Sequence, residues 1–173
     1  RFIINLIETK YSTKGADSYA HHIRKEHPTP KPPQLIERLV RFFSKKNELV
    51  FDPFMGVGST LLASSIAERK SIGIDISEKY IEIYKAANKF LKLDEQYSII
   101  ADSSKINEIP FLDNKTFDLI LTDPPYGNMM SRIKTGDAAR KKKNSNPTPF
   151  TINKNDIGNL EIEEFLIELK NII

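Results

Sequence analysis

Short apolar runs alternate along this chain with longer stretches in which apolar residues recur every three or four positions. The short runs predict buried strands at residues 49–51, 71–75, 97–101 and 117–121. The longer stretches predict helices at residues 33–46, 61–67, 78–91 and 162–173. Strands that alternate with helices are typical of a parallel sheet covered by other elements. The pattern therefore predicts an α/β fold, with a mostly parallel, twisted sheet and helices on both faces.

Two of the predicted helices carry apolar stripes that are expected to face the core. The first stripe contains Leu35, Ile36, Leu39, Val40, Phe42 and Phe43. The second contains Tyr80, Ile83, Tyr84, Ala87, Phe90 and Leu91. Residues 1–32 are expected to be irregular, apart from an edge strand at 2–7, and the proline-rich run that ends them should be extended and stiff.

An aspartate ends or follows each predicted strand. These residues are Asp52, Asp75, Asp102 and Asp123. Ligands of open α/β sheets bind beyond the carboxyl ends of the strands. Four acids in succession, each placed before a turn, therefore indicate one continuous site.

The turn after the first strand, residues 53–60, is rich in small residues and leads into a helix. Glycines allow close approach of a ligand to the backbone, and a helix start offers free N–H groups. No lysine stands where a phosphate-binding P-loop needs one, and Leu61 stands where the dinucleotide fingerprint needs its third glycine. Asp52 favours instead a ligand that carries a positively charged amino group.

The second strand ends at Asp75, which is placed to accept hydrogen bonds from ribose hydroxyls. Ile76 follows and is placed to pack on an adenine face.

The fourth strand leads directly into the sequence Asp-Pro-Pro-Tyr-Gly at residues 123–127. Two consecutive prolines fix two φ angles and remove two N–H donors, so the turn is rigid. Asp123 and the backbone carbonyls are then acceptors, and Tyr126 offers a flat stacking surface, which suits a planar group carrying an NH2. The alternative is a simple proline-rich turn.

The composition excludes several classes of protein. A chain of 173 residues is long enough for one domain with a sizeable core. The absence of cysteine excludes disulfides, thiolate zinc sites and cysteine nucleophiles, and fits a cytoplasmic protein. No apolar run is long enough to cross a membrane. The three histidines lack a carboxylate at ligand spacing, so we expect no metal site.

The positive charge is concentrated in one segment. Residues 132–143 contain six basic residues and one acid, a net charge of +5, whereas the whole chain has +3, so the remainder carries −2. This segment belongs to a long polar loop at residues 128–158, longer than ordinary connections. A local basic patch favours a polyanionic partner, and the alternative is a solvated loop.

The sequence begins at Arg1 and ends at Ile173 without a further strand. The outer edge of the fourth strand would then be unpaired, which natural sheets avoid. We therefore expect a partial domain whose fold continues beyond residue 173.

Three motifs together resemble the S-adenosylmethionine-dependent amino-methyltransferases of DNA. Residues 52–60 resemble their cofactor motif, residues 123–126 their catalytic motif, and residues 27–32 the upstream segment that completes the cofactor pocket. The resemblance covers roughly residues 20–127. It implies a Rossmann-like class I methyltransferase domain, S-adenosylmethionine as cofactor, and the N-terminal segment 1–32 as part of the cofactor pocket.

The resemblance also implies roles for individual residues. The expected catalytic residues are Asp123, Pro124, Pro125 and Tyr126. The expected cofactor-binding residues are Thr29, Lys31, Asp52, Pro53, Phe54, Gly56, Gly58, Ser59, Thr60, Asp75, Ile76, Asp102 and Ser103. The expected nucleic-acid-binding residues are Arg140, Lys141, Lys142 and Lys143, in the basic loop.

The activity implied is methylation of adenine N6 in double-stranded DNA, of the restriction-modification kind, on a base flipped out of the helix. Asp before Pro-Pro-Tyr usually accompanies adenine in this family, and Ser accompanies cytosine. The alternatives are cytosine N4 in DNA, guanine N2 in RNA, and an inactive DNA-binding subunit. In the subgroup whose cofactor motif is most like this one, the catalytic motif usually precedes the cofactor motif, whereas here it follows, which suggests a different circular arrangement. A partner subunit or a remaining chain segment is expected to supply target recognition.

Overall fold

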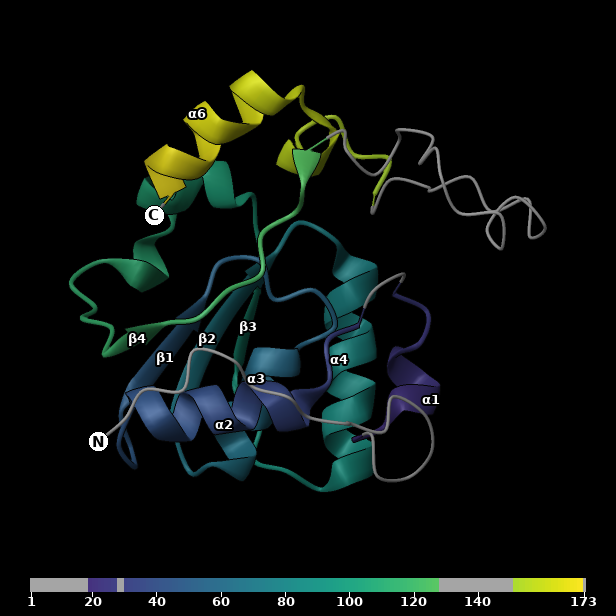
Figure 1. Ribbon diagram of the computed structural model, residues 1–173, viewed down its shortest axis with the longest axis vertical. Coiled ribbons are helices and arrows are strands. Elements are labelled where there is room, and N and C mark those ends of the chain that lie inside the picture. The colour runs from purple at the N-terminus through teal and green to yellow at the C-terminus, as the bar shows by residue number, and fades with distance from the viewer. Residues whose placement is uncertain (1–18, 28–29, 128–150, 173) are drawn as a thin grey trace, which may run out of the picture.

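The structure is a computed structural model that describes residues 19–27, 30–127 and 151–172. Its centre is a four-stranded sheet in the order β3-β2-β1-β4, with every pair of neighbours parallel (Figure 1). The strands are β1 (Leu49–Asp52), β2 (Lys70–Asp75), β3 (Tyr97–Ile100) and β4 (Leu119–Ile120). The predicted parallel sheet is therefore confirmed.

The helices connect and flank these strands. The α-helices are α1 (His21–Arg24), α2 (Pro33–Phe43), α3 (Ser59–Ile66), α4 (Glu78–Leu91) and α6 (Ile162–Ile172). The 3-10 helices are η2 (Ser103–Glu108), η3 (Pro110–Leu112) and η5 (Ile157–Asn159). Pro33 begins α2 and the Ser77 side chain caps α4, as the sequence indicates. This order of elements, with a parallel sheet at the centre, is a Rossmann-like α/β arrangement.

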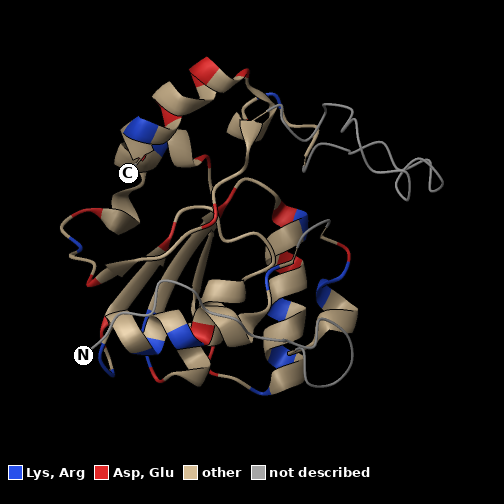
Figure 2. Cartoon of the chain, viewed as in Figure 1, with Lys and Arg blue, Asp and Glu red and all other residues tan. Residues whose placement is uncertain are grey.

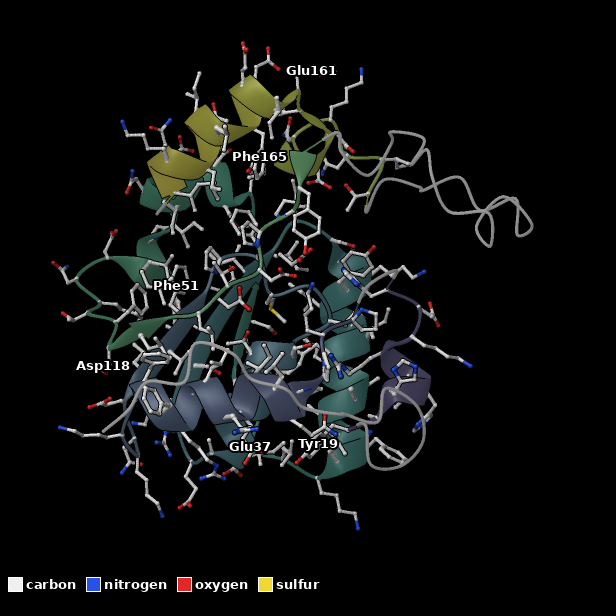
Figure 3. All side chains as sticks on the ribbon, in the orientation of Figure 1. Tyr19, Glu37, Phe51, Asp118, Glu161 and Phe165 are labelled. Atoms are coloured by element: carbon white, nitrogen blue, oxygen red, sulfur yellow. The ribbon has the colours of Figure 1, made fainter. Side chains whose placement is uncertain are left out.

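The side chains of β1 alternate between two apolar cores. Val50 packs with Val40 of α2 and with Ala67 on one face. Phe51 packs with Ile72 and Ile74 of β2 on the other face, and its ring stacks on Phe117 at 4.4 Å (Figure 3). The first face carries α2, α3 and α4. Within the described residues the second face is covered by the short helices η2 and η3 and not by an α-helix, because Pro110 interrupts that connection.

Several predictions about the helices were wrong in detail. Phe42 and Phe43 are 63% and 60% exposed. Phe42 is rotated by about 200° from the buried Val40, and Phe43 is the last residue of α2. Phe90 is also exposed and makes an edge contact with His22. Residues 21–24, expected to be irregular, form α1, while the edge strand expected at 2–7 lies outside the described residues.

The last helix, α6, lies beyond the carboxyl ends of the strands, beside η2 (Figure 1). Its residues Phe165 and Ile172 pack with Ile157 and with Phe54 from the loop after β1. Figure 2 shows acidic positions in the loops that follow the strands, on this same side of the sheet. Among the described helices, none combines the length and apolar character that a membrane span requires.

Candidate active site

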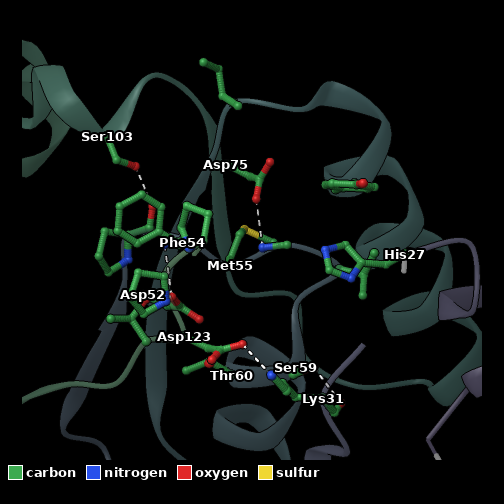
Figure 4. A pocket seen from close by; sticks show the side chains of 18 of the residues that line it. His27, Lys31, Asp52, Phe54, Met55, Ser59, Thr60, Asp75, Ser103 and Asp123 are labelled. Atoms are coloured by element: carbon green, nitrogen blue, oxygen red, sulfur yellow. Dashed lines mark hydrogen bonds and ion pairs between the residues drawn. The ribbon is translucent and has the colours of Figure 1, made fainter. Parts of the chain in front are cut away.

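A cavity of about 400 Å³ opens at the carboxyl ends of the strands (Figure 4). All four strand-end aspartates, Asp52, Asp75, Asp102 and Asp123, line it. The parallel sheet brings them together because each strand ends at the same edge. The expectation of one continuous set of acids therefore agrees with the geometry.

Asp52 forms the floor of the cavity and is only 3% exposed. Its Oδ1 accepts hydrogen bonds from the Phe54 amide at 3.1 Å and from the Thr122 hydroxyl at 2.7 Å. Thr122 follows β4, so this contact joins the ends of two neighbouring strands. Burial raises the pKa of Asp52 to about 6.

Asp75 supports the glycine turn from the end of β2. Its Oδ2 accepts a hydrogen bond from the Gly56 amide at 2.8 Å, and its Oδ1 accepts one from the Ser77 amide at 2.8 Å. Burial raises its pKa to about 6. Gly56 has a φ of +49°, and a Cβ there would lie 3.4 Å from Nε2 of His27. The backbone therefore approaches the cavity closely at this point.

Gly58 differs from its expected role, because it does not line the cavity. Its φ is +74°, and a Cβ would lie 2.2 Å from the Tyr84 ring. Glycine is thus needed at this position for packing of the loop against α4.

The third strand end contributes a cap and a buried hydroxyl. Asp102 caps η2 by accepting a hydrogen bond from the Ser104 amide at 3.0 Å. The Ser103 hydroxyl donates to the Pro53 carbonyl in the loop after β1. These contacts fasten the loop that follows β3 to the loop that follows β1.

The turn after β4 carries a cluster of three polar side chains at the cavity rim. Nζ of Lys31 lies 2.8 Å from Oδ2 of Asp123 and donates to the Tyr126 hydroxyl at 3.1 Å. That hydroxyl donates to Oδ1 of Asp123 at 3.1 Å. Burial lowers the pKa of Lys31, but the hydrogen bonds to Asp123 and Tyr126 outweigh burial, so the pKa is raised. Asp123 therefore already accepts an N–H donor.

The segment at residues 151–160 forms a wall of the site that the sequence analysis did not predict. Thr151, Asn155, Asp156 and Ile157 line the cavity. Asp156 is buried and accepts hydrogen bonds from the Gly158 amide at 2.8 Å and the Thr151 hydroxyl at 2.7 Å. The only available signal was the Asp-x-Gly spacing, which is typical of a capped turn.

This wall presses on the turn after β4. A Cβ on Gly158 would lie 2.9 Å from Cβ of Pro125, and a Cβ on Gly127 would lie 3.1 Å from the Leu160 carbonyl. Gly127 also has a φ of +58°. Phe165 of α6 packs against the same glycine (Figure 3). Pro125 and Gly127 are thus in close contact with the segment at residues 158–165.

Most of the predicted site residues meet at this one cavity. Those that line it are Lys31, Asp52, Pro53, Phe54, Gly56, Ser59, Thr60, Asp75, Ile76, Asp102, Ser103, Asp123, Pro124, Pro125 and Tyr126. Thr29, Arg140, Lys141, Lys142 and Lys143 lie outside the described residues. Other lining residues were missed, among them His27, Leu35, Leu39 and Tyr80. The helix at 33–46 was treated as core alone, because apolar spacing does not separate core from cavity wall.

No group of three potential metal ligands occurs in the part of the chain that the structure describes. This observation concerns the described ranges only.

One known protein family matches the N-terminal part of the chain. Residues 4–86 match the N6_N4_Mtase family model, described as DNA methylase. The matched range includes the upstream segment, the loop after β1 and most of α4. Over these residues the chain is similar to the N6/N4 amino-methyltransferases of DNA.

Curated relatives match over parts of their length. A tRNA (guanine(10)-N2)-dimethyltransferase from Pyrococcus abyssi is 34% identical over 100 residues, which are 58% of this chain and 30% of that protein. The Type II methyltransferase M.HpaI from Haemophilus parainfluenzae is 39% identical over 83 residues, which are 45% of this chain and 26% of that protein. The chain thus spans about a quarter to a third of these relatives.

Among solved structures, TrmN from Thermus thermophilus superposes with a TM-score of 0.54 at 22% identity. The match covers 64% of this chain and 33% of that one. This likeness supports the fold.

Proposed function

We propose that the protein transfers a methyl group from S-adenosylmethionine to the exocyclic N6 amine of adenine in DNA, with the base flipped into the cavity. One observation carries the proposal: Asp123 and Tyr126 stand at the rim of the same cavity that Asp52, Asp75 and Asp102 line, and Asp123 already accepts an ammonium group. The family match and the Type II methyltransferase relative support the reaction class.

The residues present fit S-adenosylmethionine as cofactor. The cavity of about 400 Å³ is within the usual range for small ligands. The carboxylate of Asp75 suits ribose hydroxyls, Ile76 suits an apolar adenine face, and the open backbone at Gly56 suits close approach of a ligand. When bound, this cofactor supplies an electrophilic methyl group on a sulfonium.

The turn after β4 would prepare the target amine. An exocyclic amine is a poor nucleophile because its lone pair is delocalised into the ring. The Asp123 carboxylate and the Pro124 carbonyl are placed to accept its two hydrogens, which directs the lone pair into the cavity. As positive charge grows on nitrogen, a fixed carboxylate and a fixed carbonyl dipole stabilise it. The Tyr126 ring offers a stacking surface for the base.

Lys31 would have to release Asp123 when the amine enters, because a nearby ammonium would oppose the developing charge. The two side chains are 36% and 46% exposed. An ion pair this open stabilises a protein by less than about 1 kcal/mol. Displacing Lys31 from Asp123 therefore costs less free energy than the hydrogen bonds of the entering amine would contribute.

A second candidate is methylation of a guanine N2 amine in RNA. The Pyrococcus relative favours it, since its name states that reaction and it matches over 100 residues. The same acceptor pair would serve either amine, so the rim geometry supports both substrates.

The experiment is a labelled methyl-transfer assay. The full-length protein is incubated with radiolabelled S-adenosylmethionine and either duplex DNA or RNA, and the nucleosides are separated after digestion. Label in N6-methyl-2′-deoxyadenosine from DNA is the expected result. Label in the N4-methylcytosine nucleoside from DNA, or in N2-methylguanosine from RNA, would show that the substrate is that base instead. Absence of label from both polymers would refute the proposal. The Asp123→Asn variant is the negative control for methyl transfer.

The basic loop is proposed to contact the phosphates of the distorted strand. Replacing Arg140, Lys141, Lys142 and Lys143 with glutamine should flatten the salt dependence of DNA binding, because fewer counterions are released. An unchanged slope would mean that the loop is solvated in the complex.

A further inference from the structure

A buried arginine, which does not itself line the cavity, connects two segments that do. Arg24, the last residue of α1, is 1% exposed. Its Nη2 donates to the Lys31 carbonyl at 2.8 Å and to the Ser59 hydroxyl, and its Nε donates to the Val57 carbonyl at 3.3 Å. Lys31, Val57 and Ser59 all line the cavity, whereas Arg24 does not.

The Ser59 hydroxyl closes this arrangement, because it donates to the Lys31 carbonyl at 2.8 Å (Figure 4). The upstream segment that carries Lys31 is thereby attached to the loop between β1 and α3. The side chain of Lys31 in turn forms an ion pair with Asp123. Arg24 is thus connected, through one neighbour, to both the proposed cofactor loop and the proposed base-binding turn.

The guanidinium of Arg24 matches the acceptors around it. Its planar fork donates in several fixed directions, which a lysine ammonium cannot reproduce. Burial lowers the pKa of Arg24 to about 10, so the group remains charged at neutral pH. Within the described residues its hydrogen-bond acceptors are uncharged. A buried charge of this kind is costly, and an apolar side chain would often serve stability equally well.

We propose that Arg24 is a positioning residue that sets the spacing between the loop at residues 55–59 and the segment at residues 30–32. The inference rests on the proposed function, because these two segments would hold the cofactor. One rigid group bonds to both, so their separation is fixed before a ligand arrives. Loss of the guanidinium should therefore weaken cofactor binding more than it weakens the fold.

Arg69 provides a matched control. It is also buried, at 8% exposure, and donates to the carbonyl and hydroxyl of Ser44 and to the Ala67 carbonyl. It precedes β2, at the amino end of the sheet, and does not line the cavity. Arg69→Lys therefore removes a comparable set of buried hydrogen bonds far from the site.

The test compares the full-length wild type with Arg24→Lys and Arg69→Lys. The dissociation constants of S-adenosylmethionine and S-adenosylhomocysteine are measured by calorimetry, at a temperature where thermal unfolding shows all three to be folded. Both variants should unfold at lower temperature. Arg24→Lys should raise the dissociation constants by about tenfold or more, and Arg69→Lys by less than about twofold. Equal values for the two variants would overturn the proposal.

A second measurement tests the role of Arg24 without relying on ligand binding. In the ligand-free protein, hydrogen exchange at the amides of residues 55–59 and at the amide of Lys31 should be faster in Arg24→Lys than in Arg69→Lys. The prolines on either side of Lys31 have no exchangeable amide. If Arg24→Lys does not fold, Arg24→Met, which removes the buried charge, takes its place. Equal exchange in the two variants would refute the role of Arg24. A wild type that binds neither ligand would instead refute the proposed function.

Discussion

The ammonium of Lys31 lies 2.8 Å from the carboxylate of Asp123, although 92 positions separate them, and the Tyr126 hydroxyl bonds to both. Lys31 comes from the extended segment before α2, whereas Asp123 follows β4. The upstream segment therefore meets the turn that we propose binds the base, and both line the cavity. In this structure Lys31 therefore occupies the carboxylate that we propose accepts the substrate amine.

Asp123→Asn should nearly abolish methyl transfer. The amide keeps the size of the side chain but loses the charge that stabilises the transition state, so kcat should fall by about 100- to 1000-fold. Cofactor affinity, measured by calorimetry, should remain within about threefold, since the residue is at the far rim. Asp113→Asn, in the exposed connection before β4, is the control. Equal loss of affinity and rate would show that Asp123 is structural.

Lys31→Met should have a much smaller effect. The exposed ion pair contributes less than about 1 kcal/mol to the free energy of unfolding, and the ammonium must leave before the amine binds. The kcat should therefore stay within about tenfold of the wild type. Lys46→Met, which breaks the exposed pair with Glu68 at 2.8 Å, controls for the loss of a surface charge. A defect as large as that of Asp123→Asn would place Lys31 in the chemistry.

Gly158→Ala tests the wall behind the proline turn. The added Cβ would lie 2.9 Å from Cβ of Pro125, so the two segments must separate. Overpacking of this kind should lower the free energy of unfolding by about 1–3 kcal/mol. It should also reduce kcat while cofactor affinity changes little, since Pro125 belongs to the turn that we propose binds the base. The exposed Lys154→Ala is the control, and an unaltered kcat in Gly158→Ala would mean that the wall does not support the turn.

Asp52→Asn should change how stability depends on pH. Because burial raises the pKa of Asp52 to about 6 in the folded protein, that protein binds the proton more tightly than the unfolded chain. The stability from this group is present below about pH 4 and is lost as the pH rises through about 6. Asparagine keeps the acceptor for Phe54 and Thr122 but does not titrate.

The unfolding free energy of Asp52→Asn relative to the wild type should therefore increase by up to about 3 kcal/mol between pH 4 and pH 7. Denaturant unfolding at several pH values, without ligand, measures this difference. A difference that is independent of pH would show that Asp52 has an ordinary pKa in the folded protein.

Much of the site could be predicted because it is encoded locally. Each strand is a short apolar run, and the acid that follows it is adjacent in sequence, so Asp52, Asp75 and Asp102 could be assigned to one edge once the sheet was taken as parallel. The two prolines after Asp123 fix their own φ angles without help from distant residues. Boundaries were less accurate, since β4 contains only Leu119–Ile120.

Other features depend on contacts between distant segments. The burial of Arg24 depends on carbonyls at Lys31 and Val57, and the arginine itself lies in a stretch with no apolar periodicity. The wall formed by Asp156 and Gly158 follows a long loop, and a long loop does not show in sequence where the next segment packs. The exposure of Phe42 could not be predicted because helical spacing does not reveal where the neighbouring elements end.

The sequence by itself determined the order of strands and helices, the acids at the strand ends and the rigid turn at Asp123, because propensity, apolar periodicity and proline geometry act over a few neighbouring residues. Only the tertiary structure decided that Lys31 meets Asp123, that Arg24 joins two walls of the cavity, and that Gly158 presses on Pro125. Those contacts arise when the parallel sheet brings its connections to one edge, and their geometry depends on packing among segments that no local pattern relates.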